Sequence, residues 1–252
     1  MRKLIVVLFL ALIPSALWAY DEVNYYESEA TDFQTRLSLS LDYKPVKGLT
    51  LTWSEEARFN NLSSQFDRLY SSLGISYKAH SNFTFGGSYE FQVVHKPTKP
   101  ENERFQLRHR AKLYIQPSIK FDRFSLSLRG MGQMTYRMDD FNPLQNVNPA
   151  WEFRTRLKLS YSFFSKPVKP YISVEMYNPL NKVEYAEHWV SSINYRVGVE
   201  WRIDAVNTLE FFYMFEHGME DDVDVKPNKN IVEVTREFEY NHIIGIAYNL
   251  GL

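Results

Sequence analysis

Phe33–Tyr43 reads FQTRLSLSLDY, a run in which every second residue is aromatic, aliphatic or threonine and every other one is strongly polar. Because successive side chains of a β-strand point to opposite faces, this run would form a strand with one apolar face and one polar face. After a turn-like segment at Lys44–Gly48, the same alternation resumes in Leu49–Phe59. A period of two on both sides of a short polar connection predicts an antiparallel β-hairpin.

The alternation continues along most of the remaining chain. It recurs in Arg68–Lys78, Phe83–Val93, Arg104–Gln116, Phe124–Tyr136 and Trp151–Phe163, more weakly in Tyr171–Tyr177, Tyr195–Ile203 and Leu209–Phe215, and again in Ile244–Leu252. These segments are eleven in number, whereas closed bacterial single-chain barrels have even numbers of strands. We therefore expect one more strand at Asp21–Ala30 and about twelve in total, with ten as the alternative.

The connections between these segments alternate in length. Short ones are predicted at Lys44–Gly48, Ala79–Asn82, Pro117–Asp122, Ser165–Lys169 and Asp204–Asn207, and longer polar ones at Lys96–Asn102, Met138–Asn148, Asn178–Glu187 and Gly218–Asn230. Short turns at one end and long loops at the other are typical of a transmembrane β-barrel. The sequence therefore predicts an all-β fold, a transmembrane antiparallel up-and-down barrel. Its apolar faces would meet lipid, and aromatic girdles are predicted at Tyr43, Phe59, Tyr77, Trp151, Tyr161, Phe163, Trp201 and Tyr248.

The N-terminus has the layout of a secretory signal peptide. Met1–Lys3 is basic, Leu4–Leu12 is apolar, and Ala19 offers a small residue at the cleavage point. We expect residues 1–19 to be a signal peptide and residues 20–252 to form the barrel in a Gram-negative outer membrane. The last strand, which is apolar at every second position up to Leu252, resembles the signal read by the barrel-insertion machinery. That machinery is the expected assembly partner.

The bulk composition agrees with a barrel and excludes other classes. Aromatic residues make up 16% of the 252 residues, while the mean hydropathy is only −0.38. After the N-terminal segment, no run approaches the ~18 apolar residues that a spanning helix needs. The formal net charge of −1 argues against a nucleic-acid partner. Cysteine is absent, so the fold must be held without disulfides.

The polar phase of the strands carries the functional signal, because it contains more arginine and lysine than acid. The candidate lumen residues are Arg104, Arg108, Arg110, Lys112, Arg129, Arg154, Arg156, Lys158, Arg196 and Arg202. The densest runs, Arg104–Lys112 and Arg154–Lys158, are our first choice for an anion-facing wall. Guanidinium groups bind carboxylate and phosphate through paired donors. We therefore predict a passive, porin-like, anion-preferring channel that passes small anions or acidic oligosaccharides.

Two alternatives stay open. The arginines would instead pair with glutamates on neighbouring strands and close the lumen, which leaves the loops as the working surface. A barrel enzyme acting on lipid would need a Ser or Asp within hydrogen-bond reach of His188 or His217 at the rim. No catalytic context surrounds any histidine, and no metal or cofactor motif is present. We therefore expect no enzyme activity. His109 falls on the apolar phase and predicts a β-bulge.

Four segments carry a resemblance to a known family. They are Glu103–Arg110, Trp151–Leu157, Pro170–Glu175 and Tyr195–Val199. With these segments the chain resembles a family of small bacterial outer-membrane barrels of unknown function. In its length and inward arginines it is also similar, more distantly, to porins for acidic oligosaccharides such as oligogalacturonate. That second likeness implies twelve strands and passage of anionic sugars.

Overall fold

The computed structural model describes residues 22–96, 104–138, 146–164, 166–226 and 231–252. Within these ranges the regular structure is entirely β, and no helix with the length and apolarity of a membrane span is found. The strands are β1 (Glu22–Tyr43), β2 (Leu49–Asn60), β3 (Gln65–His80), β4 (Phe83–Lys96), β5 (Arg104–Phe121), β6 (Phe124–Arg137), β7 (Ala150–Tyr161), β8 (Val168–Pro179), β9 (Ser192–Arg202), β10 (Asn207–Lys226) and β11 (Ile231–Gly251). The predicted signal peptide at 1–19 lies outside the described residues.

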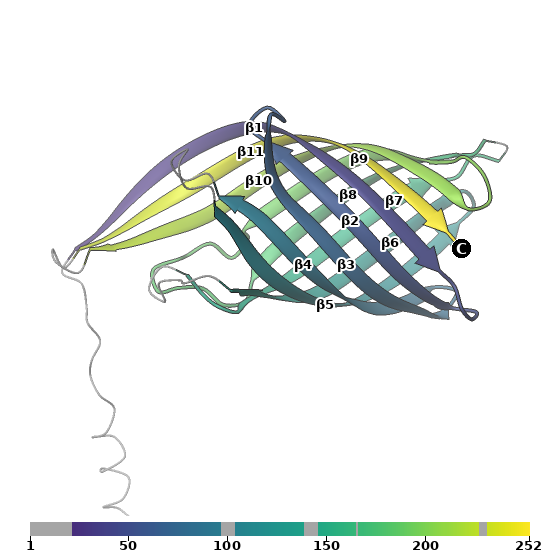
Figure 1. Ribbon diagram of the computed structural model, residues 1–252, viewed down its shortest axis with the longest axis horizontal. Coiled ribbons are helices and arrows are strands. Elements are labelled where there is room, and N and C mark those ends of the chain that lie inside the picture. The colour runs from purple at the N-terminus through teal and green to yellow at the C-terminus, as the bar shows by residue number, and fades with distance from the viewer. Residues whose placement is uncertain (1–21, 97–103, 139–145, 165, 227–230) are drawn as a thin grey trace, which may run out of the picture.

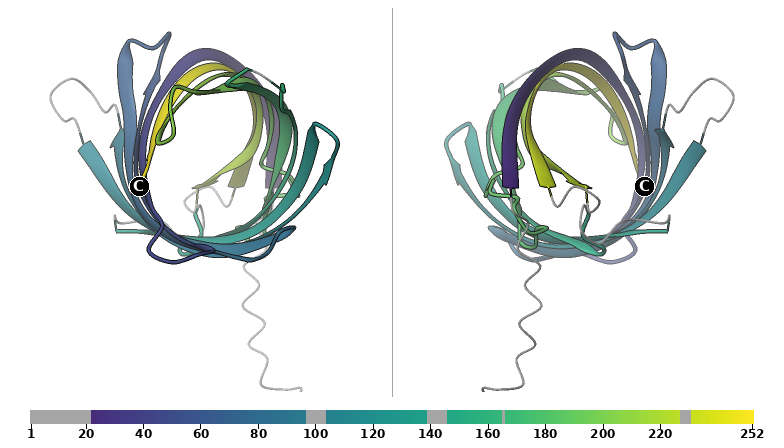
Figure 2. Two further views of the ribbon diagram at one scale, coloured as in Figure 1. Left: turned by 90° about the vertical axis from the view of Figure 1, so that its right-hand side faces the viewer. Right: turned by 90° about the vertical axis from the view of Figure 1, so that its left-hand side faces the viewer.

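The eleven strands form one closed barrel. Each strand pairs with its neighbours in sequence, and β1 closes the cylinder by pairing with β11. Ten of the eleven pairings are antiparallel, and the β1–β11 pairing is parallel. Figure 1 shows the tilted strands from the side, and Figure 2 shows the ring that they form from both ends. The predicted all-β barrel is confirmed.

The predicted strand number of about twelve, or ten, is wrong. All eleven segments recognised by alternation are strands, but Asp21–Ala30 does not form a separate one, because Glu22–Ala30 is the first part of β1. An odd number of strands leaves the first and last strands running in the same direction. The barrel closes through a parallel ladder instead, from Glu22 opposite Ile231 to Asp42 opposite Gly251. An even number was expected because a fully antiparallel barrel requires one.

Three strands extend well beyond the rest of the wall at one end. β1 pairs with β2 only from Thr35 onward, and β10 pairs with β9 only up to Gly218. The remaining parts, Glu22–Gln34, Met219–Lys226 and Ile231–Tyr240, form a three-stranded sheet that we call the flap. The flap continues past the other strands and bends across the mouth of the barrel (Figures 1 and 2). Gly218–Lys226, predicted as part of a long loop, is therefore strand.

The two faces of the wall match the predicted phases. Outward residues such as Leu73, Leu113 and Ile172 have 64%, 74% and 57% of their surface exposed. Inward residues such as Arg36 and Gln92 are buried, at 5% and 0%. The interior is therefore polar and the exterior apolar, the reverse of a soluble domain.

Two local expectations are wrong. Pro117–Asp122 is not a turn, since β5 continues to Phe121 and the chain reverses at Asp122 and Arg123. His109 does not mark a bulge, because it stays in register opposite Phe91. Its ring is kept on the outer face by Tyr89, whose hydroxyl bonds to His109 Nδ1. A polar side chain with a partner can occupy the outer phase without breaking the ladder.

Candidate functional site

The middle of the barrel encloses a cavity of about 440 Å³, here called the central chamber. Nine cationic side chains line it, together with seven carboxylates. The cations are Arg36, Arg58, Arg68, Arg110, Lys112, Arg129, Arg154, Arg156 and Arg196, and the carboxylates are Glu56, Glu90, Glu152, Glu175, Glu216, Glu220 and Glu239. All of these side chains point into the barrel, because each belongs to the inward-facing set of alternate residues on its strand. The chamber has an excess of two positive charges.

The predicted candidates divide among several levels of the lumen. Arg110, Lys112, Arg129, Arg154, Arg156 and Arg196 meet in the central chamber. Arg108 lines a second cavity of about 420 Å³ nearer the flap, the upper chamber. Lys158 lies in a narrow cavity of about 90 Å³, and Arg202 in one of about 260 Å³ at the short-turn end. The side chain of Arg104 lies outside the described residues.

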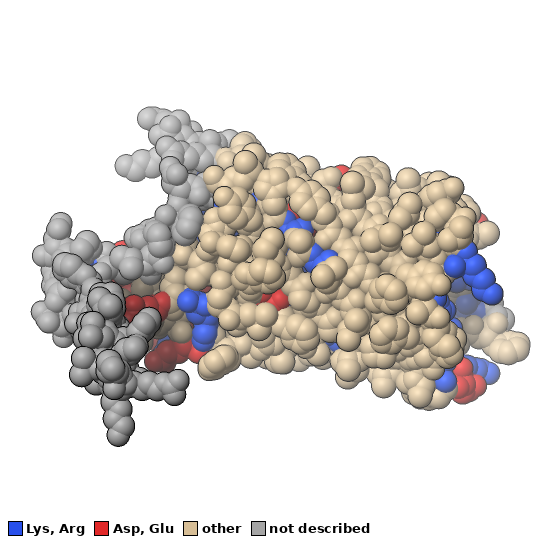
Figure 3. Space-filling view, turned by 90° about the horizontal axis from the view of Figure 1, so that it is seen from below, with Lys and Arg blue, Asp and Glu red and all other residues tan. Residues whose placement is uncertain are grey.

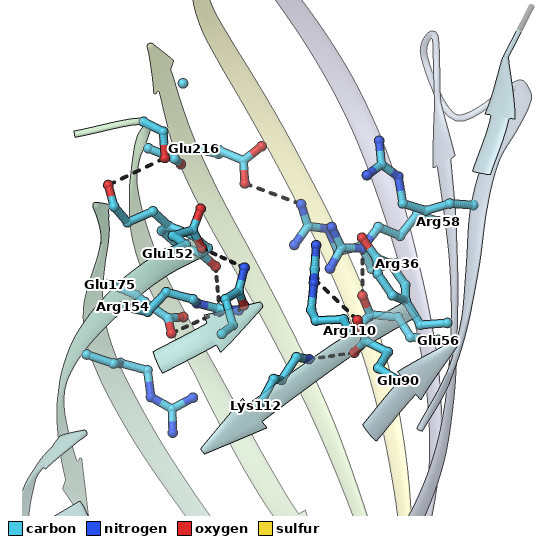
Figure 4. Close-up of a pocket in the computed structure, with 18 of the residues that line it drawn as sticks. Arg36, Glu56, Arg58, Glu90, Arg110, Lys112, Glu152, Arg154, Glu175 and Glu216 are labelled. Carbon is cyan, nitrogen blue, oxygen red and sulfur yellow. Dashed lines mark hydrogen bonds and ion pairs between the residues drawn. The ribbon is translucent and has the colours of Figure 1, made fainter. Parts of the chain in front are cut away.

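On one side of the central chamber, which we call the β1–β5 cluster, each cation has a carboxylate at ion-pair distance. Glu90 receives both Arg110 Nη1 at 3.2 Å and Lys112 Nζ at 2.5 Å. Arg58 Nε lies 2.6 Å from a Glu56 carboxylate oxygen. Figure 4 shows these residues gathered on one side, with Arg36 beside them. Arg36 reaches Glu216 on β10 at 3.5 Å.

The facing side, which we call the Glu175 cluster, holds more positive charge than acid. It consists of Arg129 on β6, Arg154 and Arg156 on β7, Arg196 on β9 and the single carboxylate of Glu175 on β8. Arg154 Nη2 lies 2.9 Å and Arg129 Nη2 3.7 Å from Glu175 Oε1. Within the part of the chain that the structure describes, neither Arg156 nor Arg196 has a carboxylate at ion-pair distance, although both interact electrostatically with Glu175.

The positive excess persists when the next acid is included. Glu152 interacts electrostatically with Arg154 and accepts a hydrogen bond from Gln133 Nε2 at 2.7 Å. Four guanidinium groups then share two carboxylates. In addition, the buried Nε groups of Arg36, Arg129 and Arg154 have no hydrogen-bond partner among the described residues. The lumen therefore retains unused cationic hydrogen-bond donors, which are suited to an anion or to water.

Aromatic rings inside the lumen hold several of these cations. Arg154 lies 4.2 Å from the ring centroid of Tyr177, Lys158 lies 3.9 Å from that of Tyr171, and Arg196 lies 4.1 Å from that of Phe212; Arg58 lies 4.4 Å from the Tyr70 centroid and Arg129 5.7 Å from the Tyr114 centroid. Cation–π contact fixes the position of a guanidinium without neutralising its charge. The rings therefore position the charges that the carboxylates do not pair.

Two of these rings, those of Tyr171 and Phe212, lie against the wall because glycines face them. A Cβ added to Gly198 would lie 2.7 Å from Tyr171, and one added to Gly245 would lie 1.9 Å from Phe212. Each aromatic residue is directly opposite its glycine on the neighbouring strand. Sequence reasoning missed this arrangement. The available signal was the occurrence of Gly198 and Gly245 in the inward phase, where a side chain is otherwise expected.

The mouth of the upper chamber is covered by the connection between β8 and β9 packed against the flap. Asp221, whose side chain is 1% exposed, accepts hydrogen bonds from the backbone N–H groups of Glu187 and His188 at 2.6 and 3.2 Å. It also lies 2.8 Å from His188 Nδ1. Val183 and Tyr185 pack on the buried flap valines Val223, Val232 and Val234.

The His188–Asp221 pair supplies the one contact that a hydrolase at the rim would require. Among the described residues, no Ser or Thr hydroxyl hydrogen-bonds to the His188 ring. Asp221 instead joins the connection to the flap, with Arg236 Nε 3.7 Å away. No group of three or more potential metal ligands was found within the described ranges.

The inner face of the flap is acidic. Glu220 on β10 lies directly opposite Glu237 on β11, an unfavourable pairing of like charges. Burial and the nearby carboxylate of Glu239 raise the pKa of Glu220. Burial and the carboxylate of Asp222 raise the pKa of Glu237. An acidic mouth therefore precedes the more basic central chamber.

A family model matches residues 33–225, which is most of the chain, and its description is "Protein of unknown function (DUF2490)". The chain belongs to this DUF2490 family. The predicted membership of a family of unknown function is thereby confirmed. No curated protein matches the DUF2490 chain at a significant level. The family carries no assigned activity, so the function must be inferred from the lumen itself.

Proposed function

We propose that this DUF2490 protein is a bacterial outer-membrane channel whose lumen prefers anions. The apolar outer wall supports the membrane location, since a closed barrel satisfies all backbone hydrogen bonds without water. Figure 3 supports it too, because on the face shown charged atoms gather toward the two ends and only a few are visible on the wall between them. The predicted signal peptide fits the same location.

The Glu175 cluster carries the anion preference. Four arginines around Glu175 and Glu152 leave positive charge uncompensated inside a low-dielectric wall, where it acts strongly on a passing ion. Small anions are the proposed passengers, and carboxylate-bearing oligosaccharides are the larger ones that match guanidinium chemistry. The proposed role is passive transport without catalysis or a cofactor. The barrel-insertion machinery is the proposed assembly partner.

Two observations favour the alternative of a closed barrel whose loops carry the function. The β8–β9 connection and the flap cover the upper chamber, and Phe212, Met214 and Ile243 form an apolar cluster on the inner wall. Both features narrow the path of an ion through the lumen. In that case the ion pairs would serve stability and the flap would be the functional surface.

Conductance in planar bilayers distinguishes the two. The purified full-length chain is expected to conduct and, in a salt gradient, to give a reversal potential of the sign that marks anion preference. Arg156→Gln should shift this potential toward zero, since it removes a lumen charge that has no close carboxylate. Glu175→Gln should shift it the other way. Arg123→Gln, at the exposed β5–β6 turn, is the matched control that removes the same charge outside the lumen.

Two results would contradict the proposal. A correctly inserted barrel that does not conduct would favour the closed alternative. A conducting barrel that prefers cations, or one in which Arg156→Gln and Arg123→Gln behave alike, would exclude the Glu175 cluster as the selective element.

A further inference from the structure

The central chamber narrows beside the Glu175 cluster. Arg156, Glu175 and Arg196 line both this chamber and the small cavity that also holds Lys158. They therefore stand where a space of about 440 Å³ passes into one of about 90 Å³. We call this boundary the neck. An ion that moves from the central chamber toward the short-turn end meets these three side chains.

The register of the sheet places two guanidinium groups side by side at the neck. Arg129 on β6 is the direct neighbour of Arg156 on β7, and Arg156 is the direct neighbour of Glu175 on β8. Like charges directly opposite each other are unfavourable in a sheet. Among the described residues, Arg156 interacts with Glu175 electrostatically but forms no hydrogen bond or ion pair. Its donors are therefore available to a ligand.

The charges around the neck indicate the charge of that ligand. The four arginines of the Glu175 cluster face two carboxylates, those of Glu175 and Glu152, which leaves an excess of two positive charges. A dianion would balance this excess. A planar carboxylate engages one guanidinium fork, whereas a tetrahedral dianion offers oxygens to several guanidinium groups at once. The neck therefore fits a phosphate or a sulfate ion better than a single carboxylate.

Glu175 distinguishes between these two dianions. Arg154 Nη2 at 2.9 Å and Arg129 Nη2 at 3.7 Å both contact Oε1 of Glu175 (Figure 4 shows the Arg154 contact). Oε2 has no hydrogen-bond partner among the described residues and is not one of the fully buried polar atoms, so a ligand can reach it. Hydrogen phosphate carries a hydroxyl group that can donate to a carboxylate oxygen, whereas sulfate has only acceptors.

We propose that the neck binds inorganic phosphate, with Arg129, Arg156 and Arg196 donating to its oxygens and Glu175 Oε2 accepting a hydrogen bond from its hydroxyl group. This inference rests on the proposed function, since it names the anion that the channel carries. At about pH 8, hydrogen phosphate, sulfate and methyl phosphate all carry two negative charges, and of the three only hydrogen phosphate has a hydroxyl hydrogen. The neck selects phosphate by that hydrogen, because the charges are equal.

The test uses the full-length chain at about pH 8. The chain is folded in detergent for equilibrium dialysis with radiolabelled inorganic phosphate, and it is inserted into planar bilayers for measurement of the chloride current. Phosphate should bind saturably and should block the chloride current at concentrations roughly tenfold lower than sulfate or methyl phosphate.

Three variants assign the binding to the neck. Arg156→Lys keeps the charge but loses the paired donors, so phosphate binding should weaken roughly tenfold while the reversal potential still marks anion preference. In Glu175→Gln the arginines hold the amide oxygen and the amide N–H groups face the ligand, so sulfate should bind as tightly as phosphate. Arg202→Lys, at the short-turn end of the lumen, is the matched control and should leave phosphate binding unchanged. Heat-modifiable electrophoretic migration checks that each variant folds.

The outcomes separate this inference from the channel proposal. Anion-selective conductance without saturable phosphate binding would overturn the inference and leave the channel proposal intact. Equal binding of phosphate and sulfate to the unaltered chain would overturn it as well, and so would an equal loss of phosphate binding in Arg156→Lys and Arg202→Lys. A folded barrel that binds phosphate with the expected preference but does not conduct would instead retain the site and reject the channel.

Discussion

The ring of Phe212 on β10 occupies the space in which Gly245 on β11, its direct neighbour across the sheet, lacks a side chain. A Cβ on Gly245 would lie 1.9 Å from Phe212 Cζ, which is a severe overlap. The glycine therefore determines that the ring lies along the wall and that Arg196 can stack on it at 4.1 Å. The width of the lumen and the position of the Arg196 charge therefore both depend on the Phe212–Gly245 pair.

Gly245→Ala is expected to push the Phe212 ring toward the barrel axis. Overpacking of this kind costs about 1–3 kcal/mol, and the displaced ring should lower single-channel conductance. Planar-bilayer recording and urea unfolding in detergent measure the two effects. Gly132→Ala is the matched control, because a Cβ there meets no atom within 4 Å. Equal effects of the two substitutions would contradict the role assigned to the ring.

Asp221→Ala is expected to release the β8–β9 connection from the flap. The buried carboxylate accepts two backbone N–H groups and contacts His188, so its loss leaves donors unpaired at a cost of about 1–3 kcal/mol. Hydrogen exchange at residues 183–188 should accelerate, while exchange in β4 and β5 stays constant. Unchanged exchange at 183–188 would show that the valine packing alone holds the connection.

Acidification is expected to stabilise the flap. The raised pKa values of Glu220 and Glu237 mean that the folded flap binds these protons more tightly than the unfolded chain does. The flap therefore gains stability as the pH falls from neutral toward the ordinary value of 4.5, and loses it as the pH rises through the raised values. Exchange rates in the flap, corrected for intrinsic pH effects, should slow on acidification. A Glu220→Gln/Glu237→Gln double variant should show much less of this change.

Glu90→Gln is expected to destabilise the barrel more than removal of an acid on the outer wall. Glu90 is 6% exposed and forms ion pairs with both Arg110 and Lys112, so Glu90→Gln leaves two buried cations with a neutral partner. Breaking a buried pair costs about 3–5 kcal/mol. Equilibrium unfolding in detergent should show the loss, and Glu55→Gln serves as the comparison. A small effect of Glu90→Gln would mean that water in the chamber hydrates both cations.

Much of the fold follows from the period of two, because a residue's phase decides whether it faces lipid or lumen. All eleven alternating segments became strands, and the inward arginines whose side chains the structure describes line the lumen at several levels. The parallel seam did not follow, since alternation says nothing about the direction in which a barrel closes. The Glu175 cluster did not follow from the alternation either, because it is the register of four neighbouring strands that brings its arginines together. The outward position of Glu55 was missed because Glu55 interrupts an otherwise apolar phase. A pattern that is judged over a whole segment does not register a single charged exception.

The parallel seam has a consequence for how the protein is made. Ser40 on β1 and Asn249 on β11 are hydrogen-bonded at 2.8 Å although 209 residues separate them in the chain. The first strand synthesised can therefore find its permanent partner only after the last has been exported. Until then, any partly formed wall has two open edges, each able to capture another strand. The flap lies along the same seam, so the mouth can be covered only after the cylinder is complete.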